Sequence, residues 1–317
     1  MSDLIEASYV QHYEAGLNIF FQQKGSLLRS RVRSESFVGT RAFYDGIRPV
    51  VAQPILVRNQ PTNLSNTSFY RRSVTLQAFD TADSLDKVDA KRILTDPSSS
   101  FLENQGYALG RAYDQALINA AFGNAFVGQT AATTVTWASV QATQQVGLQF
   151  GTSPGTNVGL TVAKMAEASR ILNYGNVPQG IPRYLAITSQ QHADLLALTQ
   201  ITSLDFNVKP TLVDGRVTHF LGFEIILIED QILDVDTVAG VTTTTTVNVL
   251  PLTAAHGTRS CLAWAKTSLL GAENPSLETR VTERADLSYA LQCYSWGNFG
   301  ATRMDERGVV EILCQEP

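Results

Sequence analysis

Long apolar runs are missing from this chain of 317 residues. No stretch approaches the roughly 18 consecutive apolar residues that a membrane-spanning helix needs. The start, MSDLIEASYV, also lacks the basic segment of a secretory signal. We therefore expect a soluble protein that is not exported. With 44% hydrophobic residues the chain can still bury a large core, in one large or two smaller domains.

Cysteine and histidine are scarce as well. The three cysteines, Cys261, Cys293 and Cys314, are odd in number, lack close metal-ligand spacing and lie in apolar, strand-like contexts. We expect buried free thiols. The four histidines are far apart in the sequence, and none forms an H-x-x-x-H pattern. The sequence therefore predicts neither a metal site nor a cofactor.

Catalytic motifs are absent or incomplete. GTSPG at 151–155 has the letters of the G-x-S-x-G nucleophile elbow, but that motif uses the backbone N–H after the serine as an oxyanion donor. Pro154 has no N–H, so the donor is missing. No G-K-[ST] follows these glycines, which argues against a phosphate loop. We predict that the protein is not an enzyme and has no catalytic residues.

Charge is distributed unevenly. Residues 1–92 contain 12 Lys+Arg and 9 Asp+Glu, a balance of +3, which leaves 12 bases and 20 acids, or −8, for the rest. A basic segment of this kind could bind nucleic acid or meet the acidic remainder of another copy. Arginine dominates it and is suited to bidentate ion pairs. The candidate contact arginines are Arg29, Arg31, Arg33, Arg41, Arg48, Arg58, Arg71 and Arg72.

Aspartate recurs at every third position from Asp80 to Asp89. Calcium loops instead alternate their ligands at every second position and need a glycine at the turn and a glutamate at the end. We interpret these carboxylates as a solvated face or as partners for the arginines. Asp80, Asp83 and Asp86 therefore join the arginines as candidate contacts between subunits.

The clearest helical pattern lies at 98–123. Serines at 98–100 can cap its start and Gly123 can end it, and about 24 residues would span about 36 Å. An alanine stripe along one side would let another backbone approach closely. We expect either an ordinary core helix or a long strut that lies across a thin sheet, with part of it facing a neighbouring molecule. The stripe consists of Ala108, Ala112, Ala116 and Ala120.

An amphipathic helix is predicted at 3–24 and extended structure at 37–79, interrupted by the turn-rich NQPTNLSNTS at 59–68. Such a two-stranded excursion cannot form a core of its own and needs a surface to lie on. Other expected elements are helices at 161–173 and 189–198, strands at 184–187 and around Leu221 and Gly222, an exposed loop or hairpin at 242–246, strands at 277–283, 287–294 and 308–314, and a turn at 305–308.

Four stretches, in their order along the chain, resemble the major capsid protein of tailed bacteriophages, in a podovirus-like branch. They are RRSVTLQAFDTADSLDKVDAKRILTDPSS (71–99), ALGRAYDQALINAAFG (108–123), FLGFEII (220–226) and TERADLSYALQCYSWGNFGATRMDERGVVEI (282–312). The resemblance implies an α+β protein with the Hong Kong 97-type phage capsid fold. Its parts would be an N-arm at 1–34, an extended E-loop hairpin at 35–80, a P-domain at 81–160 with the spine helix at about 98–123, an A-domain at 161–276 and P-domain return strands at 277–317.

The resemblance also implies hexamers and pentamers that form an icosahedral shell around non-specifically bound double-stranded DNA. The location would be the virion, after assembly in the host cytoplasm. Partners would be other copies, a portal, and scaffolding or cement proteins where they are used, but no membrane. Two alternatives are an encapsulin-like compartment shell and a nucleic-acid-binding protein that uses the basic segment. For the shell, reversing Arg71 and Arg72 to Glu is expected to block assembly and leave a folded monomer.

Overall fold

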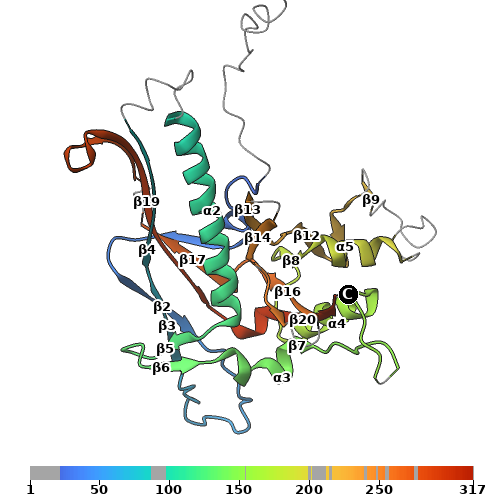
Figure 1. The fold of residues 1–317 in the computed structure, drawn as a ribbon. Helices are drawn as coiled ribbons and strands as arrows, with labels where there is room; N and C mark the ends of the chain where they lie inside the picture. The colour runs from blue at the N-terminus through green and yellow to red at the C-terminus, as the bar shows by residue number, and fades with distance from the viewer. Residues whose placement is uncertain are drawn as a thin grey trace, which may run out of the picture.

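The computed structural model of the chain describes residues 22–86, 98–153, 155–198, 201, 212–213, 216–238, 241–247, 249–253, 257–274 and 278–316. Apart from three residues without regular structure, the helix predicted at 3–24 lies outside this part. The described elements form a mixed α+β fold with one long helix, two large sheets and segments that project from the body (Figure 1). No helix among the described residues combines the length and apolarity needed to cross a membrane.

Helix α2 (Ser98–Phe122) confirms the long helix and stands along one sheet (Figure 1). Leu109, Tyr113, Leu117 and Ile118 form its buried side, and the helix packs on β19, β4 and β17. The helix therefore lies on the sheet with one side buried, as the strut interpretation expects, and a face toward a neighbouring molecule stays a prediction. The sheet runs in the order β1-β17-β19-β18, with β4 also paired to β19. Its strands are β1 (Arg33–Ser36), β4 (Gln77–Leu85), β17 (Leu269–Glu273), β18 (Glu278–Arg284) and β19 (Ala290–Arg303).

Strand β19 is longer than the sequence pattern predicted, because it continues to Arg303 instead of ending at Tyr294. The glycines of its second half hide the strand signal. At Gly300 an added Cβ would lie 2.2 Å from the carbonyl oxygen of Thr75. The glycine therefore lets a neighbouring backbone approach β19.

A second, seven-stranded sheet runs in the order β11-β12-β8-β16-β20-β7, with β15 on β16. Its strands are β7 (Gln145–Val146), β8 (Arg183–Ile187), β11 (His219–Phe220), β12 (Phe223–Leu227), β15 (Leu252–Thr253), β16 (Thr258–Ala265) and β20 (Val309–Gln315). Helices α4 (Val162–Tyr174) and α5 (Ser189–Leu196) lie beside it (Figure 1). The predicted helices and strands of this region are confirmed, although α5 ends two residues before the predicted end.

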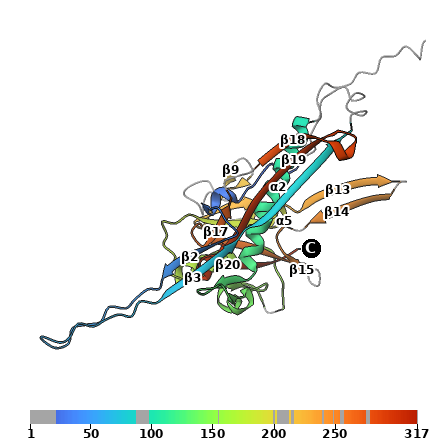
Figure 2. The same ribbon diagram turned by 90° about the vertical axis from the view of Figure 1, so that its left-hand side faces the viewer.

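The smaller elements complete the fold. A third sheet has the order β2-β3-β5-β6, and β13 pairs with β14 as a hairpin that projects from the body (Figure 2). The hairpin confirms the prediction for the run of threonines. The bounds are β2 (Arg41–Ile47), β3 (Phe69–Thr75), β5 (Ala125–Val127), β6 (Thr133–Val135), β9 (Leu212–Val213), β10 (Arg216–Val217), β13 (Gln231–Val238), β14 (Val241–Val247) and α3 (Gln141–Gln144). Short 3-10 helices are η2 (Arg29–Arg31), η3 (Trp137–Ser139), η4 (Ala285–Leu287) and η5 (Glu306–Gly308).

The core has two main parts. One lies between α2 and the sheets around Trp264, and the other lies between the second sheet and α4 around Met165. All three cysteines are buried free thiols, as predicted. Lys164 is also buried, and its ammonium group donates hydrogen bonds of 2.7 Å to the carbonyls of Val158 and Leu313. Lys164 therefore connects the loop before α4 to strand β20.

Strands from different predicted domain ranges share sheets. Strand β17 falls in the range 161–276 and pairs with β19, which falls in 277–317. Conversely, β20 of the range 277–317 pairs with β16. The division into N-arm, E-loop, P-domain, A-domain and return strands stays a proposal, and the sheets connect these ranges.

Candidate assembly surfaces

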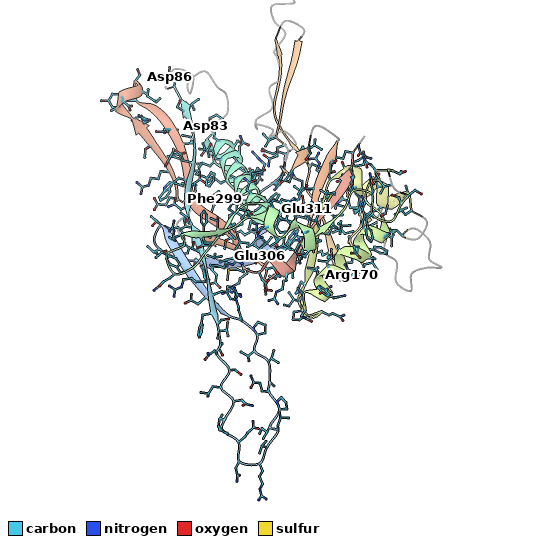
Figure 3. The ribbon with its side chains drawn as sticks, turned by 90° about the horizontal axis from the view of Figure 1, so that it is seen from below. Asp83, Asp86, Arg170, Phe299, Glu306 and Glu311 are labelled. Atoms are coloured by element: carbon cyan, nitrogen blue, oxygen red, sulfur yellow. The ribbon has the colours of Figure 1, made fainter. Side chains whose placement is uncertain are left out.

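Residues 48–68 project from the body between β2 and β3 and are named the arm here (Figures 2 and 3). Six large apolar side chains of the arm are more than half exposed. Because the arm has no second layer, these side chains cannot bury one another. They are Val50 (56%), Val51 (81%), Ile55 (80%), Leu56 (82%), Val57 (64%) and Leu64 (85%).

The arm nevertheless has a defined shape at both ends. At its root, the N–H of Arg48 donates to the carbonyl of Ser68 at 3.0 Å. At its tip, the Gln60 side-chain oxygen accepts hydrogen bonds from the N–H groups of Leu56 (2.9 Å) and Val57 (3.1 Å). Asn59 takes a left-handed conformation there, with φ of 62°. The arm is a shaped, apolar surface that no other part of the described chain covers.

Ion pairs hold the root of the arm. Arg71 donates to both oxygens of Asp45 at 2.5 and 2.9 Å, and this bond lowers the pKa of the Asp45 carboxyl. Arg72 is buried and contacts both oxygens of Glu306 in η5 at 2.5 and 2.6 Å. The second pair connects β3 to the turn between β19 and β20.

Five of the eight candidate arginines have acidic partners in their own chain. The pairs are Arg29–Glu273, Arg31–Glu224, Arg33–Glu35, Arg71–Asp45 and Arg72–Glu306. Arg41 donates to the hydroxyl of Thr75 at 3.2 Å. Arg48 and Arg58 make no side-chain bond to any described residue. Both are exposed, so they keep a free positive charge on the arm.

The expected result of reversing Arg71 and Arg72 needs correction. Arg72 is only 6% exposed, and a glutamate in its place would face the carboxylate of Glu306 without a counter-charge. Two like charges in a buried site destabilise the fold itself. The double reversal is therefore expected to destabilise the monomer itself, so a loss of shells from this variant would not test assembly.

The candidate aspartates lie on β4 and just beyond it, with Asp83 and Asp86 at the end away from the arm (Figure 3). Asp83 accepts a hydrogen bond from the Gln105 amide of α2 at 2.9 Å. Asp80 is exposed and stands opposite Trp296 in the ladder with β19. Neither Asp80 nor Asp83 contacts a candidate arginine of its own chain.

Residues 22–28, named the strap here, cross α2 at Gly110. A Cβ on Gly110 would lie 2.6 Å from the backbone carbon of Gly25, so only a glycine allows this crossing. A backbone thus approaches α2 closely at Gly110. Gly25 itself has a φ of 74°, which favours glycine.

Asp114 on α2 clamps the strap. Its buried carboxylate accepts hydrogen bonds from the Gln23 amide (2.6 Å), the Ser26 hydroxyl (2.5 Å) and the N–H groups of Leu27 (2.8 Å) and Leu28 (3.1 Å). Burial raises the pKa of Asp114, and these donors oppose the rise. Sequence reasoning missed this residue. A lone carboxylate on the buried side of a predicted helix was the available signal.

Arg303 closes the other end of α2. Its guanidinium donates to the carbonyls of Ala120 (3.1 Å), Ala121 (2.7 Å) and Gly123 (2.6 Å), which a helix end leaves without partners. A cation also complements the negative end of the helix dipole. Burial lowers the pKa of Arg303 to about 10. The contact fixes the helix to the last residue of β19.

The comparisons with known proteins identify the architecture. The sequence profile of a family described as phage capsid protein matches residues 5–316. The chain belongs to this phage capsid protein family. A comparison with curated proteins finds no match.

Solved capsid structures share the fold of this capsid protein. They include the capsid of cyanophage Pam1, with a TM-score of 0.70 at 12% identity and 99% of each chain covered. The capsid of Ralstonia phage GP4 has a TM-score of 0.69 at 12% identity, covering 98% of this chain and 96% of that one. For the capsid of cyanophage P-SCSP1u the values are 0.68 and 14%, with 99% and 95% covered.

These findings confirm the resemblance and the Hong Kong 97-type fold. The capsid protein is a structural component of the virion and not an enzyme. Its family and fold imply that it self-assembles into a capsid shell.

Proposed function

We propose that the capsid protein forms hexamers and pentamers of an icosahedral shell around double-stranded DNA, with the arm of each copy lying on a neighbouring copy. The exposure of the apolar arm carries this proposal. Burying one large apolar side chain contributes about 1.5–3 kcal/mol, so the six of the arm could contribute on the order of 10 kcal/mol before ordering costs. A neighbouring copy is the surface that would supply this burial.

The candidate contacts belong to the same proposal. Arg48 and Arg58 are the strongest of them, because both are exposed and keep a free charge. The acids that they would meet on the neighbour include Asp80, which is exposed and contacts none of the candidate arginines in its own chain. The five arginines already paired within the chain would act together with their acids. The ranges 1–34, 35–80, 81–160, 161–276 and 277–317 are the proposed N-arm, E-loop, P-domain, A-domain and return strands.

Contact with packaged DNA is proposed to be non-specific and weak. Strong binding to DNA needs many unpaired cations facing the phosphates. The internal pairing of five candidate arginines reduces that supply and also speaks against a dedicated nucleic-acid-binding protein. Assembly in the host cytoplasm, a portal, and scaffolding or cement proteins complete the proposal.

Electron microscopy of the purified full chain tests the arm. Ile55→Asp places a charge on the apolar arm, where the side chain is 80% exposed, and should abolish closed particles without altering the monomer. Tyr174→Asp is the matched control, because Tyr174 is 83% exposed at the end of α4. Circular dichroism would verify that both variants are folded. Closed particles from Ile55→Asp at the wild-type yield would refute the role of the arm.

A further inference from the structure

A pocket of about 830 Å³ lies where the arm joins the body. The ends of β2 and β3, the turn between β5 and β6, and the η5 turn between β19 and β20 contribute its walls. Figure 3 labels Glu306 from this last turn. Part of the lining is apolar, with Pro49, Phe69, Val127 and Met304. The pocket thus combines apolar walls with a charged network.

Positive charge is in excess around the pocket. Four arginines line it, against three carboxylates that are already engaged in the pairs Arg71–Asp45, Arg72–Glu306 and Arg307–Asp305. Arg48 is the fourth arginine, and it has no partner among the described residues. Arg303 adds a further positive charge, because it lies close enough to Arg72 and Glu306 to interact electrostatically with both.

Arg72 also has hydrogen-bond donors that lack an acceptor in the described part of the chain. Its side chain is buried, yet Nε and Nη1 have no hydrogen-bond acceptor among the residues that the structure describes. Each buried donor left without a partner costs about 1–3 kcal/mol. Arg48 and Arg72 both line the pocket, so a negatively charged oxygen that enters it would offset positive charge that the described residues leave unbalanced.

We propose that this pocket is a socket for an acidic segment of a second copy of this chain. A carboxylate of that segment offsets the free charge of Arg48 beside Arg72, and an apolar neighbour packs against Phe69 and Met304. A second copy fits better than an inorganic ion, because the volume and the apolar walls suit a peptide segment. The balance of −8 beyond residue 92 supplies the acids. The inference rests on the proposed shell and deepens it.

Two variants of the full chain test the socket. Gln129 lines the pocket and is exposed, so Gln129→Glu supplies a carboxylate from within the chain. We expect a higher thermal midpoint for the unassembled protein and a roughly tenfold lower yield of shells, the equivalent of about 1.4 kcal/mol. Arg48→Gln should lower the yield similarly and leave the midpoint unchanged. Gln179→Glu, an exposed position on the loop before β8, is the charge-matched control and should change neither quantity.

The outcomes separate the socket from the shell. If wild type forms shells and both pocket variants assemble at the wild-type yield, the socket is wrong and the proposed function stands. If wild type forms no shells, the proposed function and the socket both fail. A further experiment adds inorganic phosphate to the unassembled protein. A rise of the midpoint with phosphate that Arg48→Gln abolishes, together with unchanged shell yields, would assign the pocket to a free oxyanion and overturn the second copy as its occupant.

Discussion

The strap and the arm are both extended segments without regular secondary structure, but their surroundings are opposite. The strap crosses α2 at Gly110, and Asp114 accepts hydrogen bonds from four of its groups. Among the described residues, the arm makes hydrogen bonds to its own root and tip, and its apolar side chains stay exposed. An extended segment needs a surface to pack on in order to be stable. The strap has this surface on α2 of its own chain. The arm is the one that points to another copy.

The root of the arm belongs to the body, and reversing Arg72 should have the largest effect. Arg72→Glu places a buried carboxylate against the carboxylate of Glu306 and should lower the free energy of unfolding by about 3–5 kcal/mol. Arg71→Glu, on the more exposed pair with Asp45, should have a small effect. Urea denaturation of both variants checks the contrast. Equal losses of unfolding free energy in the two variants would contradict the claim that Arg72, and not Arg71, fixes the arm to the body.

The second largest loss of stability is expected from changing Asp114, which holds the strap on α2. Asp114→Ala removes the acceptor of four hydrogen bonds and leaves buried N–H groups of Leu27 and Leu28 unpaired. We expect a loss of about 2–4 kcal/mol in the free energy of unfolding. Hydrogen exchange should show faster exchange at both N–H groups. Unchanged protection there would mean that the strap does not depend on Asp114.

The crossing point offers a matched pair of glycines on one helix. Gly110→Ala forces a Cβ against the backbone of Gly25 and should cost about 1–3 kcal/mol. Gly106→Ala meets nothing within 4 Å and should raise stability by roughly 0.5–1 kcal/mol, because alanine favours helix. Thermal denaturation gives the sign of each change. A stabilising Gly110→Ala would contradict the close crossing.

The smallest effect concerns pH. Residues 48–68 contain no Asp, Glu or His, whereas the strap depends on Asp114, whose pKa is raised by burial. The folded state therefore holds the proton of Asp114 to higher pH than the unfolded state. Its contribution to stability is complete below the unfolded value of 3.8 and falls as pH rises through the folded pKa. Comparing wild type with Asp114→Asn across this range isolates the contribution, and identical profiles would exclude it.

Much of the secondary structure was predictable from local patterns. The spacing of apolar residues predicted α2 and α4, and the alternation near the end predicted β18 and β20. Strand β16 was expected only as the apolar, strand-like context of Cys261 and was given no bounds, because TRSCLAWA is buried along its whole length and shows no alternation. The place of β16 in the second sheet depends on β8 and β20, which are distant from it in the sequence.

The contacts that hold the surfaces were much less predictable. The arginine pattern indicated ion pairs, but not that Arg72 meets a glutamate 234 positions away. Glu311 is a similar case, a buried carboxylate in a strand that gathers donors from two other parts of the chain. Its donors are Trp137, Gln141, Gln145 and Ser260. Such contacts follow from the tertiary fold, so no local pattern reveals them.

The closure of α2 by Arg303 has a consequence for the order of synthesis. The helix is complete when residue 122 has been made, but the side chain that satisfies its final carbonyls arrives only with residue 303. A nascent copy that stops earlier has an open helix end and lacks the end of the central strand. Nearly the whole chain must therefore be synthesised before the end of α2 gains this contact.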